Sequence, residues 1–302
     1  MKLTMLGTGN AMVTNCYNTC FAFEEDGRCF LVDAGGGNTI LRRLHEAGID
    51  WKQTRDIFVT HKHIDHILGI VWMMRIFCQN MKRGGCSGEA RIYAHRGVVE
   101  ILQSLAATLL QKNQADYIRL QTLSERKAGD EAAFQAETCL RLIIVEDGEI
   151  TQILGHPVTF FDIHSTKAKQ FGFTMEFAPK RRLTCCGDEP YNEAEYPYAK
   201  GSEWLLHEAF CLYEQADVFH PYEKHHSTAK DAALLAEQLG VKHLLLYHTE
   251  DKNLARRREL YTAEARQQFQ GEVHVPEDLE SYELVYGYAD FCVYRKKDKV
   301  RA

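Results

Sequence analysis

The sequence predicts an α/β protein built as a four-layer α/β/β/α sandwich, in which two β-sheets are flanked by helices. Short apolar runs typical of buried strands occur in both halves of the chain, and helical patterns with one apolar face alternate with them. Sheets covered on their outer faces by amphipathic helices form such layers. No repeat, low-complexity linker or shift in composition interrupts the pattern, so residues 1–302 are expected to form a single domain.

The N-terminal half is expected to contain strands separated by helices. The turn Glu25-Asp26-Gly27 predicts a hairpin, and Asn38 is placed to cap a helix that Gly48 ends. The expected strands comprise residues 2–6, 19–23, 29–33, 57–60 and 91–94. The other helices are expected at residues 66–79 and 97–112. Residues 113–140 are polar and mixed and give no clear pattern.

The C-terminal half continues the alternation. The expected strands comprise residues 140–145, 149–154, 157–163, 171–177, 181–186, 203–206 and 241–247, with further strands near 283–296. Helices are expected at residues 228–239 and 252–268. The ends of the inner strands would then present their loops along one edge of the sandwich.

Composition indicates an ordinary soluble protein. With a formal charge of −6, the chain has no global attraction to nucleic acid or to an anionic membrane, and no apolar window approaches a membrane-spanning length. The ten cysteines lack metal-finger or disulfide spacing, and the pair Cys185-Cys186 is interpreted as core thiols. The chain enters a strand at once without a signal peptide. A reduced, cytoplasmic protein without a membrane segment is therefore expected.

Residues 60–66 carry the strongest functional signal. They lie between the apolar run Ile57-Phe58-Val59 and an apolar helical pattern, so a strand and a helix would hold them rigidly. A lone histidine is usually a solvated loop residue, but three histidines and one aspartate so close together suit a site for zinc or a similar metal. We interpret these side chains as metal ligands: His61, His63, Asp65 and His66.

Further candidate ligands follow other expected strands. His164 ends the strand at 157–163, Asp188 follows the strand at 181–186 through a single glycine, and His248 ends the strand at 241–247. Each is weak evidence alone, because a histidine at a strand end is more often an ordinary surface residue. Together with the turn at 60–66, they favour a site with two metals.

These residues resemble the metallo-β-lactamase superfamily. The motif His61-Lys62-His63-Ile64-Asp65-His66 is followed in order by His164, Gly187-Asp188 and His248. The resemblance begins at Leu6-Gly7-Thr8-Gly9 and Asp33-Ala34-Gly35, so it covers most of the chain.

Two more segments are similar to the ribonuclease Z group of phosphodiesterases within that superfamily. They are Leu206-His207-Glu208-Ala209-Phe210 and His226-Ser227-Thr228. These two motifs are more specific than the histidine motif that the whole superfamily shares.

The resemblance implies a division of ligands between two divalent metal ions. His61, His63 and His164 would hold one ion, Asp65, His66 and His248 the other, and Asp188 would bridge them. Zinc is the default metal for such ligands, with manganese or iron as alternatives. Members of the group are often homodimers, and the apolar helix at 67–77 could contribute to such an interface.

The resemblance also implies catalytic roles. Asp65 would orient a hydroxide that the two ions generate, and His226, held by Glu208, would protonate the departing oxygen of a phosphodiester. The alternatives are a surface salt bridge for Glu208 and, for His226, a residue that merely precedes a helix capped by Thr228 and Asp231.

The substrate is expected to be a transfer-RNA precursor or a smaller phosphodiester. Many ribonuclease Z proteins carry a long transfer-RNA-binding arm between the residues that match His164 and Asp188, where this chain has only 23 residues. The basic runs 180–182 and 295–299 could touch phosphates, although a solvated strand edge and a chain end explain them equally well.

Two alternatives to a phosphodiesterase stay open. One is a hydrolase of the same fold that acts on a sulfate ester, a lactone or a thioester. The other is a protein that binds metal or nucleic acid without turnover, against which the complete ligand set argues.

Overall fold

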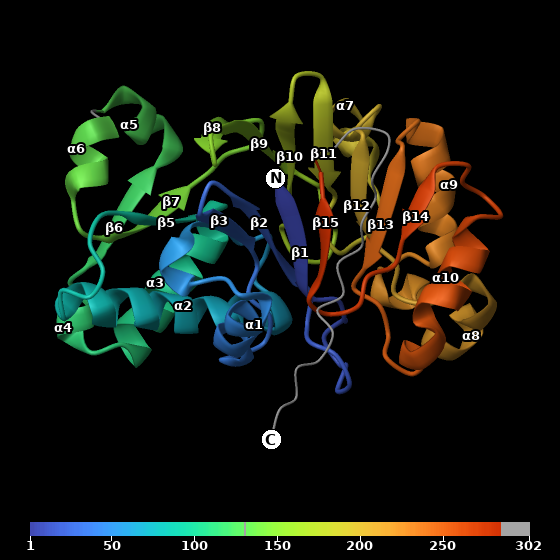
Figure 1. Cartoon of the computed structure of the whole chain (residues 1–302), viewed down its shortest axis with the longest axis horizontal. Helices are drawn as coiled ribbons and strands as arrows, with labels where there is room; N and C mark the ends of the chain where they lie inside the picture. Colours follow the sequence, from blue (N-terminus) through green and yellow to red (C-terminus); the bar gives the residue numbers. More distant parts are fainter. Residues whose placement is uncertain (130, 285–302) are drawn as a thin grey trace.

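The computed structural model describes residues 1–129 and 131–284, whose strands form two sheets (Figure 1). The eight-stranded sheet has the order β15 (Glu280–Glu283), β1 (Lys2–Gly7), β2 (Cys20–Glu25), β3 (Arg28–Val32), β4 (Thr54–Phe58), β5 (Ala90–Ala94), β7 (Leu140–Ile144) and β6 (Ile118–Thr122). The seven-stranded sheet has the order β14 (Glu272–His274), β13 (His243–Tyr247), β12 (Trp204–Glu208), β11 (Arg181–Cys185), β10 (Phe171–Ala178), β9 (His156–Asp162) and β8 (Ile150–Ile153).

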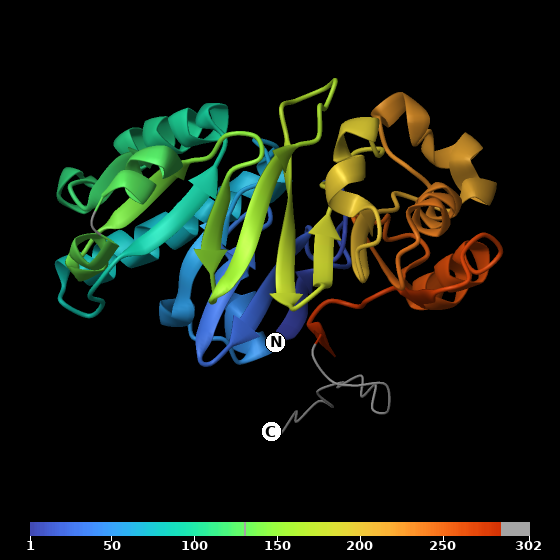
Figure 2. The ribbon, with the colours of Figure 1, turned by 90° about the horizontal axis from the view of Figure 1, so that it is seen from above.

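Helices cover the outer faces of both sheets. Four helices of the N-terminal half and those of the C-terminal half lie on opposite sides of the strands (Figure 2). The first group comprises α1 (Thr39–Ala47), α2 (Ile64–Lys82), α3 (Arg96–Leu109) and α4 (Lys112–Ala115). The second comprises α7 (Tyr196–Ala199), α8 (Ala216–Phe219), α9 (Ala229–Leu239) and α10 (Arg257–Ala265). The short helices α5 (Leu123–Ala128) and α6 (Glu131–Ala136) lie on the other side of β6 and β7 from α2–α4 (Figure 1), and Leu123 packs in the cluster between the two sheets.

Buried apolar side chains form three clusters between these layers. Side chains alternate along β4, so Ile57 packs with Ile70 of α2 while Phe58 faces the second sheet. The Phe58 ring lies 4.8 Å from that of Phe160 between the two sheets. A third cluster lies between the seven-stranded sheet and α9 and α10. The predicted four-layer α/β/β/α sandwich is confirmed; its organisation as one domain stays a prediction.

Parallel strands bring their carboxyl ends to one edge of each sheet. β3 runs parallel to β4, and β11, β12 and β13 are mutually parallel. The residues that directly follow these strands therefore lie at common edges, which is how segments far apart in the sequence reach one site. This topology places the loops that follow these strands along one edge of the sandwich, as expected.

Several expected boundaries were wrong. β4 begins at Thr54, before the apolar run, and β12 extends through Glu208. α10 is shorter than expected, and Asn38 precedes α1 without a side-chain capping bond. Residues 113–129 and 131–140, which showed no pattern, include short helices and strand β6. That strand has no buried apolar run from which it could be predicted, since the side chains of Arg119 and Leu120 are exposed.

The C-terminal strands begin earlier than expected. β14 and β15 end at His274 and Glu283, and the rest of the expected segment near 283–296 lies outside the described residues from 285 onward. The pair Cys185-Cys186 is buried and unbridged, as expected for core thiols. No described helix has both the length and the apolar character that a bilayer crossing requires.

Candidate metal centre

The turn between β4 and α2 positions the first four candidate ligands. His63 is the N-terminal cap residue of α2, so Asp65 and His66 lie on the first helical turn while His61 precedes it in the loop. His61, Asp65 and His66 are buried. The strand and the helix thus aim three polar side chains into one buried place, as the sequence pattern predicts.

One group of ligand atoms combines this turn with the residue after β11. Oδ2 of Asp188 lies 3.5 Å from Nε2 of His61 and 3.2 Å from Nε2 of His66. These three atoms lie close enough together to hold one cation. His63 belongs to none of these close groups among the described residues, but its Nδ1 atom lies 2.8 Å from Nε2 of His61, within hydrogen-bond distance.

A second group adds the residue after β13. Oδ2 of Asp65 lies 3.3 Å from Nε2 of His66 and 3.5 Å from Nε2 of His248. The same His248 atom lies 3.3 Å from Oδ2 of Asp188, so that carboxylate faces both groups. This is the position that a bridging ligand between two cations needs.

His164 lies apart from these close groups. It follows β9, its side chain is exposed, and it belongs to none of the close groups of three or more ligand atoms formed by the described residues. Its backbone is left-handed, with a φ of 54°, as is that of Asp33 (55°) and His248 (57°). Such conformations are uncommon for these residues and collect at functional sites. The role of His164 stays a prediction.

Two residues that were not predicted as site residues, Asp33 and Gln170, orient the candidate ligands. Oδ2 of Asp33 lies 2.7 Å from Nδ1 of His66, which leaves Nε2 directed at the neighbouring carboxylates. The Gln170 side chain donates to Oδ1 of Asp188 (2.6 Å) and accepts from its backbone N–H (2.8 Å). Asp33 could have been predicted from the sequence, because it is a polar residue directly after an apolar strand, like the candidate ligands. Gln170 could not, because a single glutamine before a strand has no distinguishing pattern.

The buried polar atoms of the site fit metal ions. Nε2 of His66 and both ring nitrogens of His248 are buried and make no hydrogen bond to other described residues. The ion-pair partners of Asp65 and Asp188 are imidazoles. Buried carboxylates of this kind require a compensating charge, and divalent cations supply it. The donor set of imidazoles and carboxylates suits zinc, manganese or iron.

The protonation of these groups reflects the same crowding. Burial would lower the pKa of His66, but three neighbouring carboxylates outweigh it and raise that pKa well above its ordinary value. Burial would raise the pKa of Asp188, yet the adjacent imidazoles hold it well below its usual range. The Asp188 carboxylate is therefore ionised and able to bind a cation at neutral pH.

Glu208 and His226 lie beside this cluster. Nδ1 of His226 is 3.6 Å from Oε2 of Glu208, an ion-pair distance rather than a hydrogen bond. Burial would lower the pKa of His226, but the Glu208 carboxylate raises it. Glu208 is fully buried, which excludes a surface salt bridge for it.

Packing fixes the His226 ring in the site. It stacks on Phe210 at 4.8 Å with an interplanar angle of 5°, and lies 5.1 Å from the His248 ring. Thr228 and Asp231 do form the expected capping box at the start of α9. The capping of α9 is therefore compatible with a position of His226 beside the candidate ligands.

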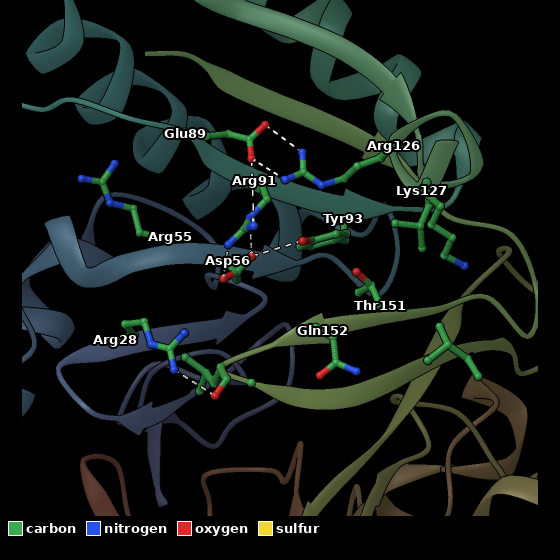
Figure 3. A pocket seen from close by; sticks show the side chains of 14 residues that line it. Arg28, Arg55, Asp56, Glu89, Arg91, Tyr93, Arg126, Lys127, Thr151 and Gln152 are labelled. Carbon is green, nitrogen blue, oxygen red and sulfur yellow. Dashed lines mark hydrogen bonds and ion pairs between the residues drawn. The ribbon is translucent and has the colours of Figure 1, made fainter. Parts of the chain in front are cut away.

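A separate cavity of about 690 Å³ lies at the other end of the strands (Figure 3). Arg28 and Arg55 line it near the starts of β3 and β4, whereas the metal cluster follows the end of β4. In Figure 3 its other arginines face acids, with Arg126 paired to Glu89. The cavity is therefore not part of the candidate metal centre.

The comparison with family models identifies the chain's family. The model of the Anti-Pycsar protein Apyc1 family matches residues 1–271. The chain belongs to this family. All the expected metal ligands of this Apyc1-family chain, from His61 to His248, lie within the matched range.

Known relatives and solved structures agree with the predicted resemblance. Ribonuclease Z from Methanothermobacter thermautotrophicus is 28% identical over 293 residues, which cover 89% of this chain and 92% of that protein. Human tRNase Z, short form, has a TM-score of 0.69 at 20% identity, covering 95% of this chain and 100% of that one. The metallo-β-lactamase fold protein YhfI from Bacillus subtilis has a TM-score of 0.68 at 16% identity, covering 93% and 98%. This Apyc1-family chain thus has the metallo-β-lactamase fold, and its resemblance to ribonuclease Z is confirmed.

Proposed function

We propose that the protein is a metal-dependent phosphodiesterase whose reaction takes place at the cluster around Asp65 and Asp188. One observation carries this proposal. Buried imidazole nitrogens of His66 and His248 have no hydrogen-bond partner among the described residues, and the Nε2 atoms of both rings face those two carboxylates. The similarity to ribonuclease Z supports a phosphodiester as the bond that is hydrolysed.

The ligands are proposed to divide between two divalent ions. His61, His63 and His164 would hold one ion; Asp65, His66 and His248 the other. Asp188 would bridge them, which its contacts with both groups support. When bound, two such ions supply a lowered pKa for a shared water and positive charge against the oxygens of a phosphodiester. Zinc is our first choice for this donor set.

The protein's own side chains would handle the protons. The carboxylate of Asp65 would accept a hydrogen bond from the attacking water and so orient it. His226 would donate a proton from Nε2 to the departing oxygen, since its Nδ1 atom faces Glu208. The raised pKa of His226 supports this role, because the imidazole then holds its proton closer to neutral pH.

The short connection between His164 and Asp188 favours a smaller phosphodiester over a transfer-RNA precursor. These residues are taken up by a short loop and the antiparallel pair β10 and β11. In the basic run 180–182, Arg181 pairs with Glu203 and Arg182 donates to a backbone carbonyl, so both have structural roles. The second basic run, 295–299, lies outside the described residues.

A second copy of the chain is a further proposed partner. Ile64, Leu68 and Trp72 are exposed by 69%, 37% and 40% and recur at four-residue spacing on α2. Such an apolar stripe supports the expected homodimer. The homodimer and the cytoplasmic location both stay predictions.

Cleavage assays on two substrates test this proposal. Zinc- and manganese-loaded protein would be given a transfer-RNA precursor with a 3′ trailer and, separately, bis(p-nitrophenyl) phosphate, with Asp65→Ala as the control. We expect turnover of the small diester that the control lacks. Cleavage of the precursor at its 3′ trailer would assign a processing nuclease despite the short connection. If neither substrate turns over, the proposal of a phosphodiesterase is wrong.

A further inference from the structure

We infer that His243, Glu272 and His274 form another metal site, which binds zinc or a similar divalent transition metal at the edge of the seven-stranded sheet. His243 is the first residue of β13, and the other two residues begin and end the edge strand β14. This site is independent of the proposed hydrolysis, because it shares no residue with the cluster around Asp188.

The distances among the three ligand atoms match those around a bound metal. Nδ1 of His243 lies 3.3 Å from Oε2 of Glu272 and 3.3 Å from Nε2 of His274, which is 3.8 Å from the same Glu272 oxygen. Ligands held tetrahedrally at zinc bond lengths are separated by about 3.3 Å. The same spacing, 3.2 to 3.5 Å, occurs among the ligand atoms around Asp188.

Hydrogen bonding alone accounts less well for this triangle of atoms. A charge-assisted bond between an imidazole and a carboxylate spans about 2.7 to 2.9 Å, which is shorter than either contact of Glu272 here. The two imidazole nitrogens lie within hydrogen-bond distance of each other, at 3.3 Å. The two separations from Glu272, which are long for a charge-assisted hydrogen bond and suited to metal ligands, favour a cation between the three atoms.

Strand register places the three side chains on one face. His243 is directly opposite Glu272 in the parallel pair of β13 and β14, and His274 is opposite Leu245, two residues further along. Because side chains alternate along a strand, residues two apart share a face. The arrangement is therefore built into the sheet rather than being an accident of flexible side chains.

Trp204 of β12 holds both imidazoles. Its ring stacks on that of His243 at 4.4 Å and 15°, and on that of His274 at 4.7 Å and 27°. Such stacking limits the rotation of both histidines, and a metal site gains affinity when its ligands are already oriented.

The three side chains combine burial with access from solvent. The side chains of His243 and His274 are only 11% and 12% exposed. Glu272 adds a negative charge from a side chain that is 57% exposed, which leaves a path for the ion from solvent.

The site would clamp an exposed edge of the fold. β14 is only three residues long, and among the described residues it pairs with β13 alone, so few of their backbone hydrogen bonds hold it. A metal bound by both strands would fix this edge. His243 and His248 are five residues apart on or next to β13, or roughly 17 Å at the rise of a strand, so the clamp acts on stability rather than on hydrolysis.

Zinc binding measured by equilibrium dialysis tests this inference. Wild-type protein, stripped with a chelator and dialysed against micromolar free zinc, is compared with Glu272→Gln and His274→Asn. The matched control is Glu259→Gln, another exposed glutamate nearby on α10. We expect one zinc ion fewer per chain in the first two variants and no loss in the control. Glu272→Gln keeps the test valid if His274→Asn fails to fold, because its side chain is largely exposed.

A stability measurement separates this site from the proposed catalytic one. In a His61→Ala/Asp65→Ala/Asp188→Ala background, which removes ligands of both proposed catalytic ions, zinc should still raise the melting temperature, and adding Glu272→Gln should abolish that rise. The inference is overturned if wild type and Glu272→Gln bind equal zinc, or if the zinc-induced rise persists in the combined variant.

Discussion

Oδ2 of Asp33 lies 2.7 Å from Nδ1 of His66, so the opposite nitrogen of that imidazole points at the carboxylates of the metal centre. The same aspartate accepts hydrogen bonds from the backbone N–H (2.9 Å) and the hydroxyl (2.7 Å) of Thr60. It thereby joins the end of β3 to the turn that carries the candidate ligands. A carboxylate in this position fixes the orientation of a ligand and raises its basicity.

We therefore predict that Asp33→Asn weakens metal binding roughly 10- to 100-fold while the fold persists. The loss arises because the neutral amide holds the His66 ring less firmly and no longer adds negative charge. Competition with a chromogenic chelator measures the affinity, and Asp217→Asn, an exposed acid on α8, is the control. Equal affinities in Asp33→Asn and wild type would contradict this role.

His226→Ala is expected to discriminate between leaving groups. A dinucleotide, whose departing alkoxide needs a proton, should lose about 10²- to 10⁴-fold in kcat, whereas bis(p-nitrophenyl) phosphate should lose far less. His225→Ala, at the exposed neighbouring position, should leave both rates near those of wild type. Equal losses on both substrates would assign His226 a positioning role instead.

Gly69→Ala should destabilise the support of the site. A Cβ atom there would lie 1.8 Å from the backbone oxygen of Ala34, in the loop that follows Asp33. The helix and the loop would have to separate, which typically costs about 1–3 kcal/mol of unfolding free energy. Gly37→Ala, where a Cβ meets nothing within 4 Å, is the control. Urea denaturation measures both, and a fully stable Gly69→Ala would show that this close contact is not required.

Glu195 predicts a dependence of stability on pH. Burial raises the pKa of this fully buried carboxyl to about 8, from 4.5. Between those pH values the folded state keeps a proton that the unfolded state releases, so this group's contribution to stability is lost as pH rises.

The variant Glu195→Gln should remove that dependence. It should exceed wild type in unfolding free energy at pH 8 by on the order of a few kcal/mol, and the difference should shrink toward pH 4.5. Urea denaturation of both proteins across this pH range measures the difference. A difference that does not change with pH would show that Glu195 ionises normally in the fold.

The sequence predicted the parts of the fold that apolar runs and helix ends encode. The strands around the turn at 60–66 and the helix ended by Gly240 carry strong local patterns, and both are present. Strand β6 was not predicted because an edge strand stabilised by backbone hydrogen bonds needs no apolar run. β14, also at an edge, is too short to give a pattern.

The convergence of the candidate ligands was predictable where they cluster in sequence or follow strands. Asp65, His66, Asp188 and His248 do converge, because parallel strands bring their ends together. Gln170 could not be predicted, since its contact with Asp188 depends on tertiary packing across two loops. The triangle of His243, Glu272 and His274 likewise depends on strand register, which no local pattern specifies.

Metal-dependent turnover of bis(p-nitrophenyl) phosphate tests the central claim most directly. Protein stripped of metal with a chelator would be assayed before and after zinc or manganese is restored, for wild type and for Asp188→Ala. A metal-dependent phosphodiesterase at this cluster predicts that stripping abolishes hydrolysis, that metal restores it in wild type, and that Asp188→Ala stays inactive. Hydrolysis that survives the chelator, or that Asp188→Ala retains in full, would contradict it.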